Sequence, residues 1–253
     1  MSFSFKTFKS YIKKCLAVFT NQSARDWDNF YSRFEDHFRG TEELISVRLK
    51  ERYGQLLLKD TLVTGHTKRT FLDLGCGRGE FLDLAKASGY QTIGVDGSGL
   101  FCRKNKQKGH LVAHNDILKF LRQRPDASVD FCTLMHVIEH LDHKYAYLVC
   151  LEIFRVLAPG GIFIIETPSL FSLWTGARQF YLDPTHLRPI HPDYLNFLCG
   201  EVGFARRELK FFAPIIDSSN PSVSLASENR ELLQTWQSWL FGPQDCAIIA
   251  QKN

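Results

Sequence analysis

Two groups of residues have the types and spacing that a binding or catalytic site requires. The first is a run of glycines that begins beside an acid, Asp73-Leu-Gly-Cys-Gly-Arg-Gly79. The second is a set of histidines and a carboxylate, His136-x-x-Glu139-His140, followed much later by His186. Imidazole nitrogens and carboxylate oxygens can carry protons or bind a metal ion, and glycines allow a bound molecule to approach the backbone.

The glycine run is preceded by a short apolar segment and followed by apolar residues at helical spacing, which predicts a strand, a tight turn and a helix. The glycines at 75, 77 and 79 would let the backbone contact a ligand where a Cβ atom would collide. A helix that begins at Gly79 or Glu80 would point its free N–H groups at the same place. The third glycine comes one residue too early for the dinucleotide fingerprint, so an NAD oxidoreductase is a weaker alternative.

Acidic residues follow the next two predicted strands. Asp96, next to Gly97, lies roughly 20 residues beyond the glycine run, where an acid can accept hydrogen bonds from ribose hydroxyls. The alternative for Asp96 is an exposed aspartate in a turn. Asp116, followed by Ile117, would begin a helix that its carboxylate can cap, whether or not it also contacts a ligand.

The histidine and carboxylate set follows the predicted strand that ends at Met135. Open α/β sheets bind ligands at the carboxyl ends of their strands, so this position favours a functional site. The spacing would place His136, Glu139 and His140 on roughly one face of a helix. There they could bind a divalent metal ion together with His186. In the alternative, Glu139 and His140 cap a helix and form a wall of the ligand pocket.

A segment rich in proline, Asp183-Pro-Thr-His-Leu-Arg-Pro-Ile-His-Pro192, predicts a stiff loop that can cover this site. His186 within it is a candidate general base. Asp183 is a candidate for substrate binding. Arg188 and His191 could bind an anionic group of the substrate, such as an acidic sugar or a nucleotide phosphate.

The elements that must position these residues alternate regularly between strand and helix, which predicts a parallel sheet with helices on both faces. Strands are expected at 70–74, 91–96, 110–114, 129–135, 161–166, 206–213 and 245–251. Helices are expected at 27–38, 42–59, 80–88, 98–108, 116–122, 143–157 and 191–202. Two late strands joined by the long excursion 214–244 suit an antiparallel edge. The organisation expected is a helical cap over 1–69 and one α/β domain over 70–253.

The composition is that of a globular protein that can bury a core, with 44% hydrophobic and 23% charged residues among 253. A formal net charge of +4 is too mild to indicate nucleic-acid binding. Seven scattered cysteines without a Cys-x-x-Cys pair predict reduced thiols and a cytoplasmic location, and argue against disulfides or a zinc ribbon. Residues 1–20 alternate aromatic and lysine residues, which predicts a helix that is docked, frayed, or bound to an anionic membrane surface.

The order of these motifs over residues 70–168 resembles the class I S-adenosylmethionine (SAM) methyltransferases. Besides the motifs above, it includes the run Leu157-Ala-Pro-Gly-Gly161. The resemblance implies a Rossmann-like sheet of seven strands, the last antiparallel, and SAM as methyl donor. It also implies the following cofactor-binding residues: Arg39, Asp73, Gly75, Cys76, Gly77, Arg78, Asp96, Gly97, Asp116, Ile117 and Met135.

Two narrower resemblances concern the acceptor. The runs Phe34-Glu-Asp-His-Phe-Arg-Gly40 and 180–192 look like methyltransferases found with bacterial O-antigen and capsule synthesis, which implies a sugar hydroxyl or related glycan group as acceptor. The set Glu139, His140 and His186 is similar to the metal site of plant small-RNA methyltransferases and ubiquinone O-methyltransferases, from which His136 departs by replacing a glutamate. The alternatives are a quinone or phenolic acceptor, and a SAM-binding subunit that scaffolds polysaccharide assembly at the membrane.

Overall fold

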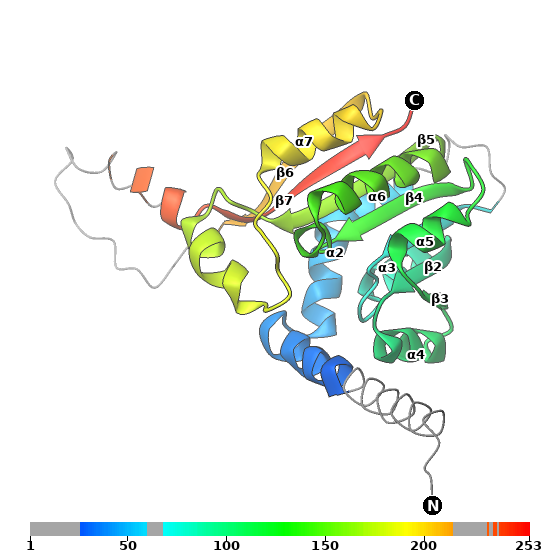
Figure 1. Cartoon of the computed structure of the whole chain (residues 1–253), viewed down its shortest axis with the longest axis horizontal. Helices are drawn as coiled ribbons and strands as arrows, with labels where there is room; N and C mark the ends of the chain where they lie inside the picture. Colours follow the sequence, from blue (N-terminus) through cyan, green and yellow to red (C-terminus); the bar gives the residue numbers. More distant parts are fainter. Residues whose placement is uncertain (1–25, 60–67, 215–231, 233–234, 237) are drawn as a thin grey trace, which may run out of the picture.

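A twisted sheet of seven strands forms the centre of the molecule (Figure 1). The computed structural model describes residues 26–59, 68–214, 232, 235–236 and 238–253. The strand order is β3-β2-β1-β4-β5-β7-β6, in which β1 to β5 pair in parallel and β7 runs antiparallel to both β5 and β6. The strands are β1 Thr70–Leu74, β2 Gln91–Asp96, β3 Leu111–His114, β4 Val129–Met135, β5 Leu157–Pro168, β6 Arg206–Pro214 and β7 Pro243–Gln251. The predicted fold class, including the antiparallel last strand, is confirmed.

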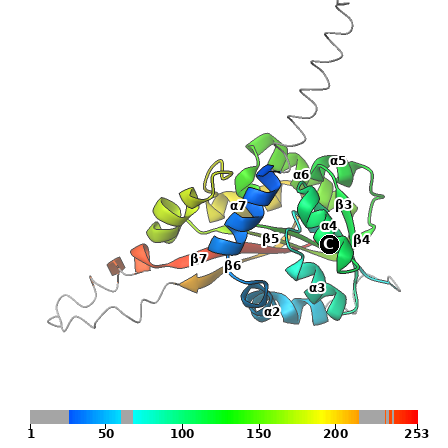
Figure 2. The same ribbon diagram turned by 90° about the horizontal axis from the view of Figure 1, so that it is seen from below.

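Helices cover both faces of the sheet, as Figure 2 shows from a second side. The long helices are α2 Glu42–Lys59, α3 Glu80–Ala87, α4 Gly99–Gln107, α5 Ile117–Arg122, α6 His143–Val156 and α7 Pro192–Glu201. Residues 26–38 are also helical. Short turns of helix occur at η2 Ile138–His140, η3 Thr175–Gln179 and η4 Phe180–Leu182.

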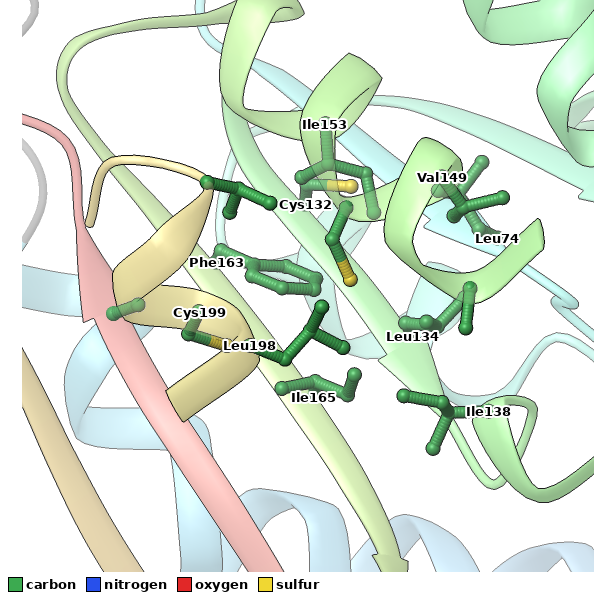
Figure 3. Close-up of a cluster of buried hydrophobic side chains, with 14 of the residues drawn as sticks. Leu74, Cys132, Leu134, Ile138, Val149, Ile153, Phe163, Ile165, Leu198 and Cys199 are labelled. Carbon is green, nitrogen blue, oxygen red and sulfur yellow. The ribbon is translucent and has the colours of Figure 1, made fainter. Parts of the chain in front are cut away.

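The core consists of two apolar layers, one on each face of the sheet. One layer joins β4 and β5 to α5, α6 and α7, and Figure 3 shows Phe163, Ile153 and Leu198 interdigitating there. The other layer joins β1 to α2 and α3, through Tyr53 and Phe81 among others. Fully burying side chains of this size contributes roughly 1.5–3 kcal/mol each. Helix α2, which precedes the first strand, therefore contributes to the core of the α/β domain.

The largest departure from the expected elements concerns β5. Pro159-Gly-Gly161 was expected to stop a helix and precede a strand that begins at 161, but α6 ends at Val156 and the strand begins at Leu157. Gly160 adopts a left-handed φ of 79°, and its N–H donates to the carbonyl of Lys252 at 2.8 Å. This hydrogen bond joins the start of β5 to the residue that follows β7.

Two predictions, reduced cysteines and the relation to a membrane, can be compared with the structure only within the described residues. The cysteines at 76, 102, 132, 150, 199 and 246 are buried free thiols, as the scattered pattern predicted. Within the described ranges, no helix has the length and apolar character needed to cross a membrane. The expected helix over 1–20, Cys15 and most of the excursion 214–244 lie outside the described residues.

A buried arginine fastens the cap to the glycine turn. The side chain of Arg78 is 2% exposed, and its Nε donates to Glu80 at 2.8 Å. Its Nη1 donates to the carbonyl of Gly40 at 2.9 Å and lies 3.3 Å from the carboxylate of Asp36. Removing one partner of a buried ion pair leaves the other charge uncompensated, so this contact determines how the cap is placed.

We expect Arg78→Ala to lower the free energy of unfolding by about 3–5 kcal/mol, because Glu80 would remain buried without its partner. Equilibrium unfolding in urea measures this change. The matched control is Arg206→Ala, which removes an exposed guanidinium at the sheet edge and should cost less than about 1 kcal/mol. An equal decrease in the free energy of unfolding in the two variants would show that Arg78 stabilises the fold no more than an exposed arginine does.

Candidate active site

A cleft of about 880 Å³ lies at the carboxyl ends of the parallel strands. Its floor includes the glycine turn after β1 and the ends of β2, β4 and β5. The helix at 26–38 and α2 form one wall, and the segment from Gln179 to His186 forms another. The open α/β sheet therefore places its cleft where this class of sheet binds ligands.

The glycine turn was expected to be free of side chains so that a ligand could approach. At two of its three glycines, however, a Cβ atom would collide with a side chain of the protein itself. A Cβ atom on Gly75 would lie 2.4 Å from Val137, and one on Gly79 would lie 2.0 Å from Asn105. Both residues also have left-handed φ angles, of 74° and 90°. Gly77 lines the cleft, where a Cβ atom would come within 3.5 Å of Arg39.

The acid after β2 is held in place by the glycine turn. Asp96 accepts hydrogen bonds from the backbone N–H of Gly77 at 2.8 Å and of Ser98 at 2.7 Å. Its carboxylate is buried at the edge of the cleft, and burial raises its pKa. Gly97 lines the cleft beside it. The alternative of an exposed turn aspartate is therefore wrong.

Asp73 lies beneath the glycine turn, also in the cleft wall. Its carboxylate accepts a hydrogen bond from the hydroxyl of Thr133 at 2.7 Å. Burial raises the pKa of Asp73 to about 7, although the hydrogen bond from Thr133 acts in the opposite direction. Cys76 and Met135 line the cleft as well. A cationic ligand group in this position would favour the ionised carboxylate.

The cap brings an ion pair to the same place. Arg39 Nη1 lies 3.6 Å from the Glu35 carboxylate, and both side chains line the cleft. Among the described residues, Glu35 Oε2 is buried without a hydrogen-bond partner. Sequence reasoning selected Arg39 and missed Glu35. Glu35 lies on the predicted helix at 27–38 and Arg39 directly follows it, so their spacing of four residues was the available signal.

Three predicted cofactor residues are not among the described residues that line the cleft. Arg78 points away to the cap, as described above. Asp116 caps α5 by accepting from the N–H of Lys119 at 2.8 Å, and it also accepts from the hydroxyl of Tyr145 at 2.6 Å. Ile117 follows it in the same helix. The capping interpretation of Asp116 is therefore confirmed, and its contact with a ligand stays a prediction.

A second group of functional side chains lies at the other half of the cleft, which His140 and His186 line, while Glu139 is fully buried beside them. Glu139, His140 and His186 each offer a ligand atom, and these atoms lie within 4.8 Å of one another. His186 Nε2 is 3.9 Å from Glu139 Oε1. That oxygen is buried and also lies 3.4 Å from His136 Nδ1. We call Glu139, His140 and His186 the acceptor cluster.

The hydrogen bond of His186 determines its tautomer. Its Nδ1 lies 2.6 Å from the carbonyl oxygen of Phe180, which can only accept, so Nδ1 carries the hydrogen. Burial lowers the pKa of His186. A neutral ring with Nδ1–H leaves the lone pair on Nε2, on the side of Glu139. His186 can therefore accept a proton or bind a metal ion.

His136 does not join the acceptor cluster as a fourth ligand. It adopts a left-handed φ of 52°, and only residues 138–140 form a short helix, so the expected helical face does not exist. Its ring lies between two carboxylates, 3.4 Å from Glu139 and 3.1 Å from Glu166. Burial would lower the pKa of His136, but the hydrogen bonds to Glu139 and Glu166 raise it to about 10. His136 belongs instead to a second set with Glu166 and Asp245, whose ligand atoms also lie within 4.8 Å of one another.

A further network that sequence reasoning missed surrounds His136. Arg52 of α2 donates to Glu166 at 2.9 Å and to Asp245 at 2.8 Å, and the hydroxyl of Tyr53 also donates to Glu166. These residues come from α2, β5 and β7, and more than 100 positions separate α2 from its partners. No local pattern could have indicated them.

The predicted substrate residues separate into two groups. Asp183 lines the cleft. Arg188 and His191 are not among the described residues that line it. Arg188 donates to the carbonyl of Leu141 at 2.6 Å, and His191 caps α7 by accepting from the N–H of Asp193 at 3.2 Å. Both side chains thus contact backbone groups, and the binding of an anionic substrate group by Arg188 and His191 stays a prediction.

The sheet order, the glycine turn and the acid after β2 together define the class I methyltransferases. Residues 45–209 match the family described as a methyltransferase domain. The chain belongs to this family, for which SAM is the implied methyl donor.

Individual relatives support the assignment. A SAM-dependent methyltransferase from Archaeoglobus fulgidus has a crystal structure that superposes with a TM-score of 0.77 at 32% identity, covering 88% of this chain and all of that one. A "Probable S-adenosylmethionine-dependent methyltransferase" from Mycolicibacterium smegmatis is 33% identical over 138 residues, 54% of this chain and 52% of that protein. A malonyl-[acyl-carrier protein] O-methyltransferase from Serratia marcescens is 28% identical over 130 residues, 51% of this chain and 49% of that protein. The chain thus spans about half the length of the curated relatives it matches.

The residues in the first half of the cleft fit SAM. With SAM bound, Arg39 would supply a cation for the carboxylate of the methionine portion, and Asp73 and Glu35 would supply acceptors for its ammonium group. Glu35 Oε2 lies 3.6 Å from Arg39 Nη1 but accepts no hydrogen bond from the described residues, which leaves it capacity for such a donor. Asp96 keeps unused acceptor capacity for ribose hydroxyls, since a carboxylate can accept about four hydrogen bonds.

We expect the affinity for SAM to be about tenfold weaker at pH 6 than at pH 8. Asp73, whose pKa burial raises to about 7, is mostly protonated at the lower pH and must lose this proton to face an ammonium group. Calorimetric titration at several pH values measures the slope. Asp73→Asn should flatten it, and Thr133→Val should move its midpoint to higher pH. An unchanged slope in Asp73→Asn would assign the effect to other groups.

Proposed function

We propose that the protein is a SAM-dependent O-methyltransferase whose acceptor is the hydroxyl group of a sugar or related glycan. The observation that carries the proposal is the acceptor cluster, which places the lone pair of His186 Nε2 beside a buried carboxylate in the cofactor's own cleft. SAM, when bound, supplies a methyl group that is already electrophilic. The chain therefore has to align the acceptor, exclude water and remove a proton.

His186 is suited to removing that proton. A sugar hydroxyl is far too weak an acid to lose its proton at neutral pH, so a base must take it as the bond to carbon forms. The low pKa of His186 keeps its ring neutral, and the carbonyl of Phe180 keeps the lone pair on Nε2. Glu139, 3.9 Å away, would stabilise the imidazolium that results.

The same cluster favours a hydroxyl acceptor over a carboxylate acceptor. The Serratia marcescens relative is by its name an O-methyltransferase of a malonyl-[acyl-carrier protein]. A carboxylate is ionised at neutral pH and requires no base. A carboxylate acceptor would therefore not need the two histidines beside the buried glutamate, whereas a hydroxyl acceptor needs a group that removes its proton.

A divalent metal ion also fits the acceptor cluster. The donor set of two imidazoles and one carboxylate is common for such ions, and the three ligand atoms lie within 4.8 Å of one another. His186, with its Nδ1–H bound to a carbonyl, has the partner that orients metal-binding histidines. Glu139, His140 and His186 would hold the ion, which would lower the pKa of a bound hydroxyl.

A phenol or quinol is the second candidate acceptor, and two observations favour it. Arg188 and His191 are not among the described residues that line the cleft, where an acidic glycan would need them. Aromatic side chains of the cap, Trp27, Tyr31 and Phe38, line the cleft instead. Against it, a phenol is more acidic than a sugar hydroxyl and needs a weaker base than the acceptor cluster provides.

We expect labelled SAM to transfer its methyl group to a sugar hydroxyl when the protein is incubated with a panel of acceptors. The panel contains sugar nucleotides and glycans, with catechols and reduced quinones as the competing class. Mass spectrometry and radioactivity identify the methylated product. Transfer to the phenolic members alone would replace the proposed acceptor by the second candidate. Tight SAM binding without transfer to any member would favour a non-catalytic subunit.

We expect His186→Ala to lower turnover by roughly 10²–10⁴-fold with little change in SAM affinity, because the base would be lost while the cofactor half stays intact. Steady-state rates and calorimetry measure the two quantities. His143→Ala is the matched control, since His143 is an exposed histidine on α6 that packs against Tyr194. A rate unaffected by chelation of metal ions would assign His186 to proton removal alone, and an unaltered rate in His186→Ala would remove it from the mechanism.

A further inference from the structure

A chain of hydrogen bonds runs from the cap helix to His140. The hydroxyl of Tyr31 donates to Asp183 Oδ2 at 2.8 Å, which joins positions that are 152 residues apart. Asp183 Oδ1 accepts from the backbone N–H and the hydroxyl of Thr185, at 2.8 and 2.6 Å. The same hydroxyl oxygen of Thr185 lies 2.8 Å from His140 Nδ1. Tyr31, Asp183, Thr185 and His140 all line the cleft.

Counting the hydrogens in this chain decides the tautomer of His140. A threonine hydroxyl has a single hydrogen, and the Thr185 hydroxyl gives it to the Asp183 carboxylate, which can only accept. The contact between Thr185 and His140 must therefore be made with a hydrogen from the ring. His140 Nδ1 carries that hydrogen, and in the neutral ring the lone pair is on Nε2.

We propose that Asp183 and Thr185, steadied from the cap by Tyr31, are positioning residues that hold His140 in its Nδ1–H tautomer. The lone pair on Nε2 then serves the reaction of the acceptor cluster, either as proton acceptor or as metal ligand. This use of Nε2 rests on the proposed function, whereas the tautomer does not. His186 reaches the same tautomer through a backbone carbonyl, so both histidines of the cluster are prepared in the same way.

The assignment adds a positioning role to Asp183. The sequence suggested a substrate ligand, and in the structure its two oxygens accept three hydrogen bonds from the protein. Tyr31 also belongs to the helix whose residues Glu35 and Arg39 line the cofactor half of the cleft. The carboxylate of Asp183 therefore connects the placement of the cap with the tautomer of His140.

Two matched pairs of variants test the proposal by NMR of protein labelled with ¹⁵N-histidine, at a pH where His140 is neutral. Asp183→Ala frees the hydrogen of Thr185 to point at His140 and should convert the ring to the Nε2–H tautomer. Asp183→Asn keeps an acceptor oxygen opposite the N–H of Thr185 and should preserve the Nδ1–H tautomer. Thr185→Val should lose the Nδ1–H tautomer, and Thr185→Ser should keep it. The ¹⁵N signals of His140 are those that disappear in His140→Gln.

Zinc binding supplies a second measurement, with Zn²⁺ as the only added ligand. Loss of the partner that orients a metal-binding histidine typically weakens metal binding by about 10–100-fold, so Asp183→Ala should lose this much and Asp183→Asn little. Tyr181→Phe is the control, because it removes an exposed hydroxyl from the same segment. The same His140 tautomer in wild type, Asp183→Ala and Thr185→Val would overturn the proposal. Absence of zinc binding by a wild-type protein with the expected tautomer would remove only the metal from the proposed function.

Discussion

A buried carboxylate, Glu139, is the constraint around which the acceptor half of the cleft is built. Its side chain is fully buried, and an isolated charge in such a place costs several kcal/mol. Burial would raise the pKa of Glu139, but the hydrogen bond and positive charge of His136 lower it. The hydroxyl of Thr167 adds a hydrogen bond at 3.1 Å. The Oε1 atom of Glu139 lies 3.4 Å from His136 Nδ1 and 3.9 Å from Nε2 of His186, which carries the proposed chemistry.

The compensation of this charge extends to the far side of the sheet. His136 is itself held by Glu166 and Asp245, which Arg52 of α2 neutralises in turn. The left-handed backbone of His136 is a strained conformation for a residue with a side chain, and such strain persists where the surroundings impose it. The two carboxylates that flank the ring on opposite sides provide that restraint. His136, which itself lines the cleft, thus places positive charge directly beside the buried Glu139.

The cap has a double role in this arrangement. One end of its helix carries Glu35 and Arg39 to the cofactor half, and Tyr31 reaches the segment that covers the acceptor half. The match to the methyltransferase family begins at residue 45, so the helix at 26–38 lies outside the region that defines the family. Parts added to a common fold are where acceptor preferences are expected to differ.

The sequence by itself determined the fold and part of the cofactor half of the site. Alternation of apolar runs and helical patterns is a local signal, and it predicted the seven strands, with the antiparallel edge indicated both by the long excursion and by the resemblance. Asp73 and Asp96 were identifiable because strand ends in a parallel sheet meet at one edge, whatever the side chains elsewhere do. Only the tertiary structure decided the acceptor half. It placed His136 outside the short helix of Glu139 and His140 while keeping its ring 3.4 Å from Glu139, and it turned Arg188 and His191 to the backbone. It also joined Tyr31 to Asp183 across 152 positions. Hydrogen-bond partners so distant in the chain leave no periodic pattern, because their pairing depends on where separate elements pack.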